Sequence, residues 1–384
     1  MKKIAVVTAT RAEYGILRPL IFRLKKENNF QVLLYVTGTH FSQQYGNTQT
    51  EIVKDGLQID RKIQILEDGN TPYDISLTMA NALRGFARAF RDDKPDLLIV
   101  LGDRTELLGI CSAALNERIP IAHLHGGELT EGAVDDCVRH AVTKMSHLHF
   151  PAAEIYRQRI IQMGESPDRV INVGALGVEN ILNAPLLSYE QLCEEVGIPL
   201  NHKYVVVTFH PVTLELEEAE CQVQTFIDAM MEESQYFYLI TKANADAGGW
   251  KVNEMLEQFA SRTSGVRLTA SLGMVRYLSA VKYCEFVLGN SSSGIIEAPA
   301  FGTPTVNIGN RQKGRLMAET IISCENSKEE IITAMQKAAQ TEHRASTVYG
   351  SGNTSEKITE AVKDFLEYND NNLKKQFYDI ERSR

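Results

Sequence analysis

Two successive series of short apolar runs and amphipathic stretches constrain the fold of this chain more than any other feature. In the first half, the runs typical of strands are rich in β-branched residues and lie at Ile4–Thr8, Gln31–Thr37, Leu97–Leu101, Ile119–His123, Leu148–Pro151 and Val170–Val173. The stretches between them have helical spacing, for example at Leu17–Lys26, Ile75–Arg91, Glu106–Asn116, Asp135–Met145 and Ala153–Met163. Such alternation predicts parallel sheets covered by helices.

The pattern begins again after Ala184-Pro185 and a polar segment that reaches Lys203. The second series of predicted strands lies at Tyr204–Thr208, Tyr236–Thr241, Val266–Thr269, Cys284–Gly289 and Thr305–Ile308. A chain of 384 residues also exceeds what one core usually holds. We therefore predict an α/β protein with two Rossmann-like, doubly wound domains facing each other across a cleft. The first comprises residues 1–182 and a C-terminal helix within 358–384, and the second comprises residues 183–357.

Charge and cysteine usage exclude several classes of protein. The net charge is −9 and no basic stripe is present, so we expect no nucleic-acid partner. The six cysteines form no CxxC pair and have no metal-ligand spacing, which indicates reduced thiols and no metal site. No apolar run has the roughly 18 residues that a membrane span needs. We therefore expect a soluble, cytoplasmic protein without a membrane partner.

Ligands of doubly wound sheets bind at the carboxyl ends of the strands, so the residues that follow each strand are the most informative. The first strand leads into Arg11, but the segment lacks the GxGxxG pattern of dinucleotide-binding proteins. An arginine and free amides at a helix start suit a diphosphate, although an ordinary turn is an alternative. His40 follows Gly38, where it could contact a ligand or cap a helix.

Three further strand ends of the first half carry titratable groups. Asp103 and Arg104 follow one strand, and His125 and Glu128 flank a pair of glycines after the next. Asp135 stands where a helix is expected to begin. Helix capping would explain the aspartates as well. The combination also suits acid–base chemistry on a sugar.

The second half carries groups that match a diphosphate. His210 follows a strand, and Gly289 begins a turn that contains Ser291, Ser292, Ser293 and Gly294 before a helix. Small residues and free amides at a helix start favour an anion, and a serine cap is the simpler alternative. Glu297, one turn later, could accept hydrogen bonds from ribose hydroxyls, and Arg311 could close over the phosphates.

The ordered motifs TRAEYG, GTH, GDR, HGGE, DDxxRHxxTK, FHPVT, GNSSSG and GxRQKGR span nearly the whole chain. This set resembles the hydrolysing UDP-N-acetylglucosamine 2-epimerases, which include a bacterial sialic-acid pathway enzyme and the epimerase part of a vertebrate bifunctional enzyme. The resemblance implies a GT-B-like fold and conversion of UDP-N-acetylglucosamine and water to N-acetylmannosamine and UDP. It implies elimination to a 2-acetamidoglucal followed by hydration, for sialic-acid-type sugar biosynthesis. It further implies a homodimer or homotetramer that requires no cofactor and binds UDP as product.

The resemblance also assigns roles to residues. The implied acid–base and neighbouring residues are Asp103, Glu128, Asp135, His125, Arg104 and His40. The implied UDP-binding residues are Arg11, His210, Asn244, Leu272, Ser291, Ser292, Ser293, Gly294, Glu297 and Arg311. Two positions depart from the vertebrate enzyme, which has glutamate at the position of His125 and aspartate at that of Glu13.

Other functions fit the same pattern. The same chemistry could act on UDP-N,N′-diacetylbacillosamine, in legionaminic-acid synthesis. A GT-B glycosyltransferase shares the fold but transfers the sugar to an acceptor. A non-hydrolysing epimerase would return a UDP-sugar, and a binding protein without activity would not need the three carboxylates.

Overall fold

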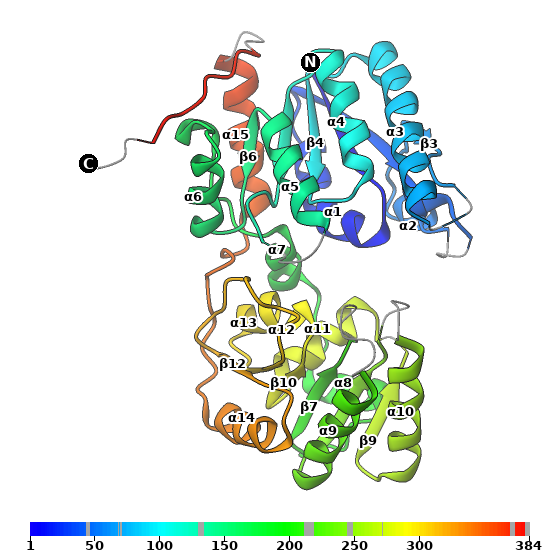
Figure 1. Ribbon diagram of the computed structural model, residues 1–384, viewed down its shortest axis with the longest axis vertical. Coiled ribbons are helices and arrows are strands. Elements are labelled where there is room, and N and C mark those ends of the chain that lie inside the picture. Colours follow the sequence, from blue (N-terminus) through cyan, green and yellow to red (C-terminus); the bar gives the residue numbers. More distant parts are fainter. Residues whose placement is uncertain are drawn as a thin grey trace. The chain divides into compact units, whose positions relative to one another are not determined.

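The computed structural model describes residues 1–43, 47–67, 69, 71–129, 134–210, 219–243, 249–270, 272–368 and 373–380. The chain divides into two compact units (Figure 1). The first unit comprises Met1–Asn180 and Gly350–Arg384, and the second comprises Ile181–Tyr349. Both chain ends therefore belong to the first unit.

The first unit is built on a parallel six-stranded sheet of order β3-β2-β1-β4-β5-β6. Its strands are β1 (Lys2–Thr8), β2 (Phe30–Thr37), β3 (Arg61–Ile63), β4 (Leu97–Leu101), β5 (Ile121–Leu124) and β6 (Leu148–Phe150). The chain runs outward from β1 in one direction and then returns to start at β4 on its other side. The point where β1 and β4 meet is the topological switch, where ligands of such sheets bind.

Helices cover both faces of this sheet. They are α1 (Arg11–Lys25), α2 (Gln49–Lys54), α3 (Pro72–Asp93), α4 (Glu106–Asn116), α5 (Val134–Met145), α6 (Glu154–Gln162), α7 (Leu176–Asn183) and α15 (Thr354–Tyr368), with 3-10 turns η1 (Gly38–Phe41) and η2 (Pro167–Arg169). Alternate residues of β1 enter two cores: Ile4 packs with α1 and α15, whereas Ala5 packs with α3, α4 and α5. Burial on both faces explains why the strand reads as a continuous apolar run.

Helix α15 returns to the first unit after the chain has passed through the second. Its Ile358 and Val362 are fully buried in the same core as α1. Two ion pairs link it to the α1 region, Arg23 to Glu356 at 3.0 Å and Lys363 to Glu27 at 2.7 Å. The last helix therefore completes the core of the first unit.

The second unit repeats the same topology, with sheet order β12-β11-β10-β7-β8-β9. Its strands are β7 (Tyr204–Thr208), β8 (Phe237–Thr241), β9 (Val266–Thr269), β10 (Phe286–Gly289), β11 (Thr305–Ile308) and β12 (Ile321–Cys324). Its helices are α8 (Tyr189–Val196), α9 (Ala219–Glu232), α10 (Gly249–Arg262), α11 (Gly273–Tyr283), α12 (Ser292–Ile296), α13 (Ala298–Phe301) and α14 (Lys328–Gln340). The switch point of this sheet lies between β7 and β10, which are neighbours.

The predicted fold class is confirmed: both units are parallel α/β sheets of the doubly wound, Rossmann-like type. The prediction missed β3 and β12, because both are short edge strands without a continuous apolar run. The strand predicted at Val170–Val173 is wrong in extent. Val170 makes a single parallel bridge with His149, and the left-handed Gly174 (φ 87°) then turns the chain.

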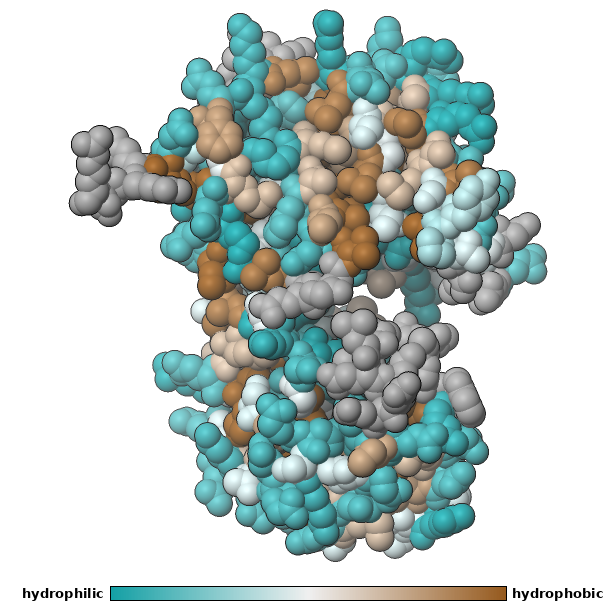
Figure 2. All heavy atoms as spheres, viewed as in Figure 1, coloured by the Kyte–Doolittle hydropathy of each residue, from teal (hydrophilic) through white to brown (hydrophobic). Residues whose placement is uncertain are grey.

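Among the helices of the described ranges, none combines the length and the hydropathy that crossing a membrane requires. On the face shown in Figure 2, hydrophobic residues gather in a stripe on the first unit, whereas hydrophilic residues dominate the second.

Candidate functional site

The switch point of the first unit opens into a pocket of about 270 Å³. Its lining comes from the ends of β1, β4 and β5 and from α1 and α5, and consists of Thr10, Glu13, Ile16, Leu101, Gly102, Asp103, Arg104, His125, Glu128 and Arg139. Four residues that the sequence singled out, Asp103, Arg104, His125 and Glu128, thus share one pocket.

Arg139 of α5 holds this pocket together. Its guanidinium is almost fully buried and forms an ion pair with Asp103. It also donates to a carboxylate oxygen of Asp136 at 2.6 Å and to the carbonyl of Glu128 at 2.9 Å. One fork-shaped cation therefore fixes Asp103, the start of α5 and the loop that carries Glu128. The helix that the sequence predicted at Asp135–Met145 supplies this residue.

The loop after β5 has an unusual backbone that its glycines allow. Gly127 has φ 80°, and a Cβ there would overlap the carbonyl oxygen of Tyr156. His125 itself has φ 61°, a conformation that costs a β-carbon-bearing residue about 1 kcal/mol or more. Its Nδ1 lies 3.5 Å from Glu128 Oε1, and its buried Nε2 has no partner among the described residues. The fold thus holds an imidazole beside a carboxylate at the pocket wall.

Glu13 faces Arg104 across the same pocket. Its carboxylate accepts the backbone N–H groups of Ala9 at 2.7 Å and Thr10 at 3.0 Å, and it completes a capping box with Thr10 at the start of α1. Burial raises the pKa of Glu13 to about 7, against the opposing charge of Arg104. Arg104 in turn donates from Nε to the buried Glu106 at 2.6 Å. The pocket therefore contains a carboxyl group that titrates near neutral pH.

Three other predicted residues of the first unit lie around this pocket rather than in its wall. Asp135 is exposed at the start of α5, and partial burial of its carboxyl, together with the charge of Asp103, raises its pKa. Arg11 is exposed at the start of α1 and pairs with Glu51 at 3.3 Å. His40 is fully buried, and its two ring nitrogens contact the hydroxyls of Thr8 at 3.0 Å and Thr48 at 2.8 Å. Burial lowers the pKa of His40 to about 4, so this geometry suits a neutral residue that supports the end of β1.

In the second unit, Asn290 joins the strand ends at the switch point. Its side-chain oxygen accepts the N–H of His210 at 2.7 Å, and its side-chain nitrogen donates to the carbonyl of His210 at 2.8 Å. The carbonyl of Asn290 accepts from Arg311 Nη1 at 3.0 Å and from Gln312 Nε2 at 2.9 Å. His210, Arg311 and the serine turn are thereby brought to one place, next to a cavity of about 530 Å³ that Asn290 also lines.

The serine turn has the geometry of a helix start. Ser291 is the N-cap of α12 and accepts the N–H of Ser293. Ser293 donates to the carboxylate of Glu297 and accepts from the hydroxyl of Tyr277 at 2.7 Å. Burial raises the pKa of Glu297, and the hydrogen bond from Ser293 opposes this rise. Gly294 is buried against Thr305, with which its carbonyl bonds at 2.9 Å.

Three further predicted nucleotide contacts are Leu272, Asn244 and Ser292. Leu272 is buried just before α11, and its carbonyl accepts from Arg276 Nε at 2.9 Å. Asn244 lies outside the described residues. Ser292 begins α12 directly after the cap residue.

A family model for UDP-N-acetylglucosamine 2-epimerase matches residues 23–363 of this chain. The chain belongs to the UDP-N-acetylglucosamine 2-epimerase family. Among relatives, it is 40% identical to the GDP/UDP-N,N′-diacetylbacillosamine 2-epimerase (hydrolyzing) of Campylobacter jejuni, over 84% of each chain. It is 30% identical to the UDP-N-acetylglucosamine 2-epimerase of Neisseria meningitidis, over 99% of this chain and 100% of that one.

Solved structures of the family share the fold. The crystal structure of a UDP-GlcNAc 2-epimerase from Neisseria meningitidis bound to UDP-GlcNAc aligns with a TM-score of 0.81 at 18% identity. The alignment covers 95% of this chain and all of that chain. The two-domain GT-B-like architecture expected for this family is therefore confirmed.

Three residues that organise the two switch points were not predicted from the sequence. They are Arg139, Glu13 and Asn290. Each lies within a motif quoted from the sequence. Arg139 and Asn290 also have partners that are distant in the chain, whereas Glu13 accepts from the nearby Ala9 and Thr10. Arg139 has one signal that was available, because it follows Asp136 at i+3 on a helix. The link from Asn290 to His210 spans 80 residues and has no local signal.

We predict that Arg139→Lys lowers turnover by about tenfold or more while the protein remains folded. A lysine keeps the charge, but one ammonium cannot hold three acceptors in the geometry of a fork, and a lost charge-assisted hydrogen bond is worth roughly 1.5–3 kcal/mol. The measurement is kcat with a UDP-sugar substrate. Arg157→Lys is the matched control, because Arg157 also joins three acceptors of this unit, the carbonyls of Val170 and Pro167 and the carboxylate of Glu154. Wild-type turnover in Arg139→Lys, or an equal loss in both variants, would contradict the role given to Arg139.

We also predict that Glu13 makes the protein less stable as the pH rises from 4.5 to 7. Its pKa is 4.5 in a free chain and about 7 in the folded state, so within this window the folded state binds more protons than the unfolded state. The free energy of unfolding of wild type relative to Glu13→Gln should therefore fall between pH 5 and pH 7 in urea titrations. Glu117→Gln, at an exposed position, serves as the control and should show no such difference. Parallel curves for wild type and Glu13→Gln would show that the Glu13 carboxyl titrates as it does in a free chain.

Proposed function

We propose that this protein is a hydrolysing 2-epimerase that converts UDP-N-acetylglucosamine and water to N-acetylmannosamine and UDP. Membership of the 2-epimerase family gives the reaction class. The observation that carries the proposal is the pocket at the first switch point, which Asp103, His125 and Glu128 line together and in which Arg139 fixes both Asp103 and the loop that carries Glu128. A pocket with several carboxylates and an imidazole suits the movement of protons on a sugar.

The second unit supplies the complement of a diphosphate. Asn290 gathers His210 and Arg311 beside the amides at the start of the Ser291 turn. A guanidinium and free backbone N–H groups are the usual protein partners of phosphate oxygens. Glu297, one turn further, offers a carboxylate for ribose hydroxyls once Ser293 releases it. We infer that this unit holds UDP.

The proposed chemistry has two stages. A base removes the proton from C2 while the C1–O bond breaks, so the electron pair forms the C1–C2 double bond and UDP leaves. Water then adds its oxygen to C1, and a proton returns to C2 on the opposite face. Asp135, whose pKa is raised by partial burial and by the charge of Asp103, suits the proton donor, and the His125–Glu128 pair suits the base. Asp103, paired with Arg139, orients these groups. Water is the only co-substrate, and no cofactor takes part.

A second candidate substrate is UDP-N,N′-diacetylbacillosamine. The relative at 40% identity bears this substrate in its name, and the chemistry at C1 and C2 would be the same. The two substrates differ only at the far side of the ring, which leaves the roles of the acid–base residues unchanged.

The test is product analysis by NMR in deuterated water, with each UDP-sugar incubated separately and no acceptor present. We expect free N-acetylmannosamine that carries deuterium at C2, together with UDP, from UDP-N-acetylglucosamine. The corresponding free product from the diacetyl sugar alone would establish the second candidate. A UDP-sugar as the only product would indicate a non-hydrolysing epimerase, and an absence of turnover without an acceptor would favour a glycosyltransferase.

We predict that a substitution in the second unit changes UDP affinity, whereas a substitution in the first unit changes kcat. Arg311→Ala should weaken UDP binding by about tenfold or more, because it removes a cation from the diphosphate. Asp103→Asn should lower kcat far more than it changes UDP affinity, because the amide loses the ion pair with Arg139. Calorimetry with UDP and steady-state kinetics measure the two effects. Lys313→Ala, an exposed cation of the Arg311 loop, is the control for a general charge effect. Unchanged UDP affinity in Arg311→Ala would remove this residue from the diphosphate site.

A further inference from the structure

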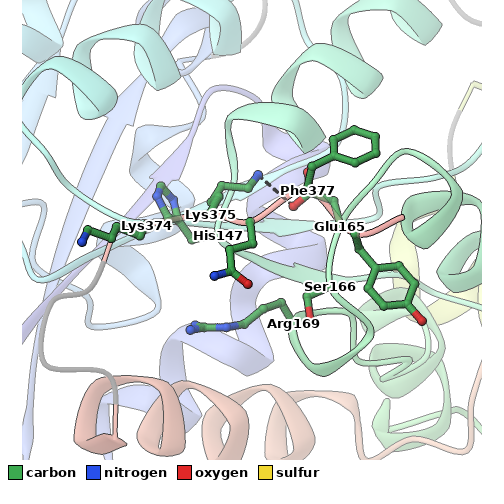
Figure 3. Close-up of a pocket in the computed structure, with 9 residues that line it drawn as sticks. His147, Glu165, Ser166, Arg169, Lys374, Lys375 and Phe377 are labelled. Carbon is green, nitrogen blue, oxygen red and sulfur yellow. Dashed lines mark ion pairs between the residues drawn. The ribbon is translucent and has the colours of Figure 1, made fainter. Parts of the chain in front are cut away.

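A second pocket of the first unit lies away from the strand ends that form the candidate site. It has a volume of about 310 Å³, and its lining consists of His147, Glu165, Ser166, Arg169, Lys374, Lys375, Gln376, Phe377 and Tyr378 (Figure 3). Residues 373–380, which we call the C-terminal segment, supply more than half of this lining. The segment follows α15 and runs along the part of the unit that carries α5 and β6.

The C-terminal segment docks through specific contacts. The N–H of Tyr378 donates to the carbonyl of Gly164 at 2.9 Å. Gly164 has φ 88°, and a Cβ there would overlap the ring of Phe377, so glycine allows the ring to lie directly against the backbone. The ammonium of Lys144 lies 5.3 Å from the centre of the same ring, within cation–π range. These contacts place Lys375 at the end of α5.

The ammonium of Lys375 closes the C-terminal end of α5. It donates to the carbonyl of Lys144 at 2.9 Å and to the carbonyl of Ser146 at 2.5 Å. The last carbonyls of a helix have no partner within the helix, and the helix dipole favours a cation there. The start of the same helix carries Asp135, Asp136 and Arg139 of the candidate site. The C-terminal segment therefore binds the C-terminal end of α5, opposite to the end that lies at the candidate site.

Lys375 also neutralises a buried carboxylate. Glu165 is 2% exposed and accepts from Lys375 at 2.8 Å, Lys144 at 2.5 Å and His149 Nε2 at 3.0 Å. Although burial raises the pKa of Glu165, the hydrogen bonds from His149 and the two lysines lower it to about 2. An ionised carboxylate only accepts, so His149 donates from Nε2 to Glu165.

Two buried histidines on neighbouring strands lie between Glu165 and the candidate site. His149 of β6 is the register partner of His123 of β5, so the two rings stand side by side on one face of the sheet. His123 contacts the hydroxyl of Thr143 of α5 at 3.1 Å. Its Nε2 donates to the carbonyl of Gly102 at 2.7 Å, directly before Asp103. Burial lowers the pKa of His123 to about 3, so this link stays neutral near pH 7.

We propose that Lys375 is a positioning residue for the reaction and that the C-terminal segment sets the orientation of α5. Lys375 fixes one end of the helix through its C-terminal carbonyls. Arg139 of the same helix joins α5 to Asp103, so a change in the orientation of α5 reaches the candidate site. Without Lys375, Glu165 loses one of its two lysine partners, and α5 loses the ammonium at its C-terminal carbonyls. The inference rests on the proposed function, because it assumes that the residues at the start of α5 act in turnover.

The experiment compares Lys375→Met, Lys375→Arg and Lys363→Met in the full-length chain. Lys363 is the matched control, since its ion pair with Glu27 at 2.7 Å is also in the first unit and its side chain is 34% exposed, against 29% for Lys375. We expect Lys375→Met to lower kcat by about tenfold while KM and the Kd for UDP stay within twofold of wild type. Lys375→Arg, which can still donate to the carbonyls and to Glu165, should restore most of kcat. All kinetics are measured well below the melting temperature of every variant.

Hydrogen exchange gives a readout that needs no substrate. Amides of residues 137–145 should exchange faster in Lys375→Met than in wild type and Lys363→Met, with those of β7 and β10 unchanged. Wild-type exchange in α5 of Lys375→Met would overturn the proposal even if neither UDP-sugar is a substrate. Faster exchange with an unchanged kcat, or an equal fall of kcat in both methionine variants, would also overturn it. Failure of the wild-type protein to release UDP would count against the proposed function alone.

Discussion

The guanidinium of Arg139 is the interaction on which the candidate site depends. It pairs with Asp103 at the end of β4 and with Asp136 at the start of α5, and it donates to the carbonyl of Glu128. Three segments that are distant in the chain are thus joined by one buried cation. Removal of a partner from such a group leaves a charge without solvation, which is why these contacts hold the pocket in one arrangement. The oxygen atoms of the pocket then face a common space.

The two units share one topology but carry different chemical groups near their switch points. In each, the strand order places two strand ends side by side at the switch point. Around this point the first unit carries carboxylates and an imidazole, and the second unit carries serine hydroxyls, amides and a guanidinium. A protein with a net charge of −9 can therefore provide a local environment for an anion without a basic surface.

Much of this organisation could be predicted from the sequence, because it depends on local patterns. The continuous apolar run of β1 and its turn into Arg11 gave both a buried strand and the strand end at a switch point. The edge strands β3 and β12 could not be predicted, since a three- or four-residue edge strand buries few side chains. The grouping of Asp103 with Glu128 followed from the rule that parallel strands end at one edge. The parts played by Arg139 and Asn290 could not follow, because they depend on contacts between residues 36 and 80 positions apart.

The carboxylate of Glu13 has two functions that cannot be separated. It caps the first turn of α1 by accepting two backbone N–H groups, and the same oxygen atoms form part of the pocket wall opposite Arg104. Any substitution that changes the charge of the wall also changes how the chain enters its first helix. One carboxyl group thus determines both the start of the helix and the charge of the pocket wall, so neither property can be altered alone.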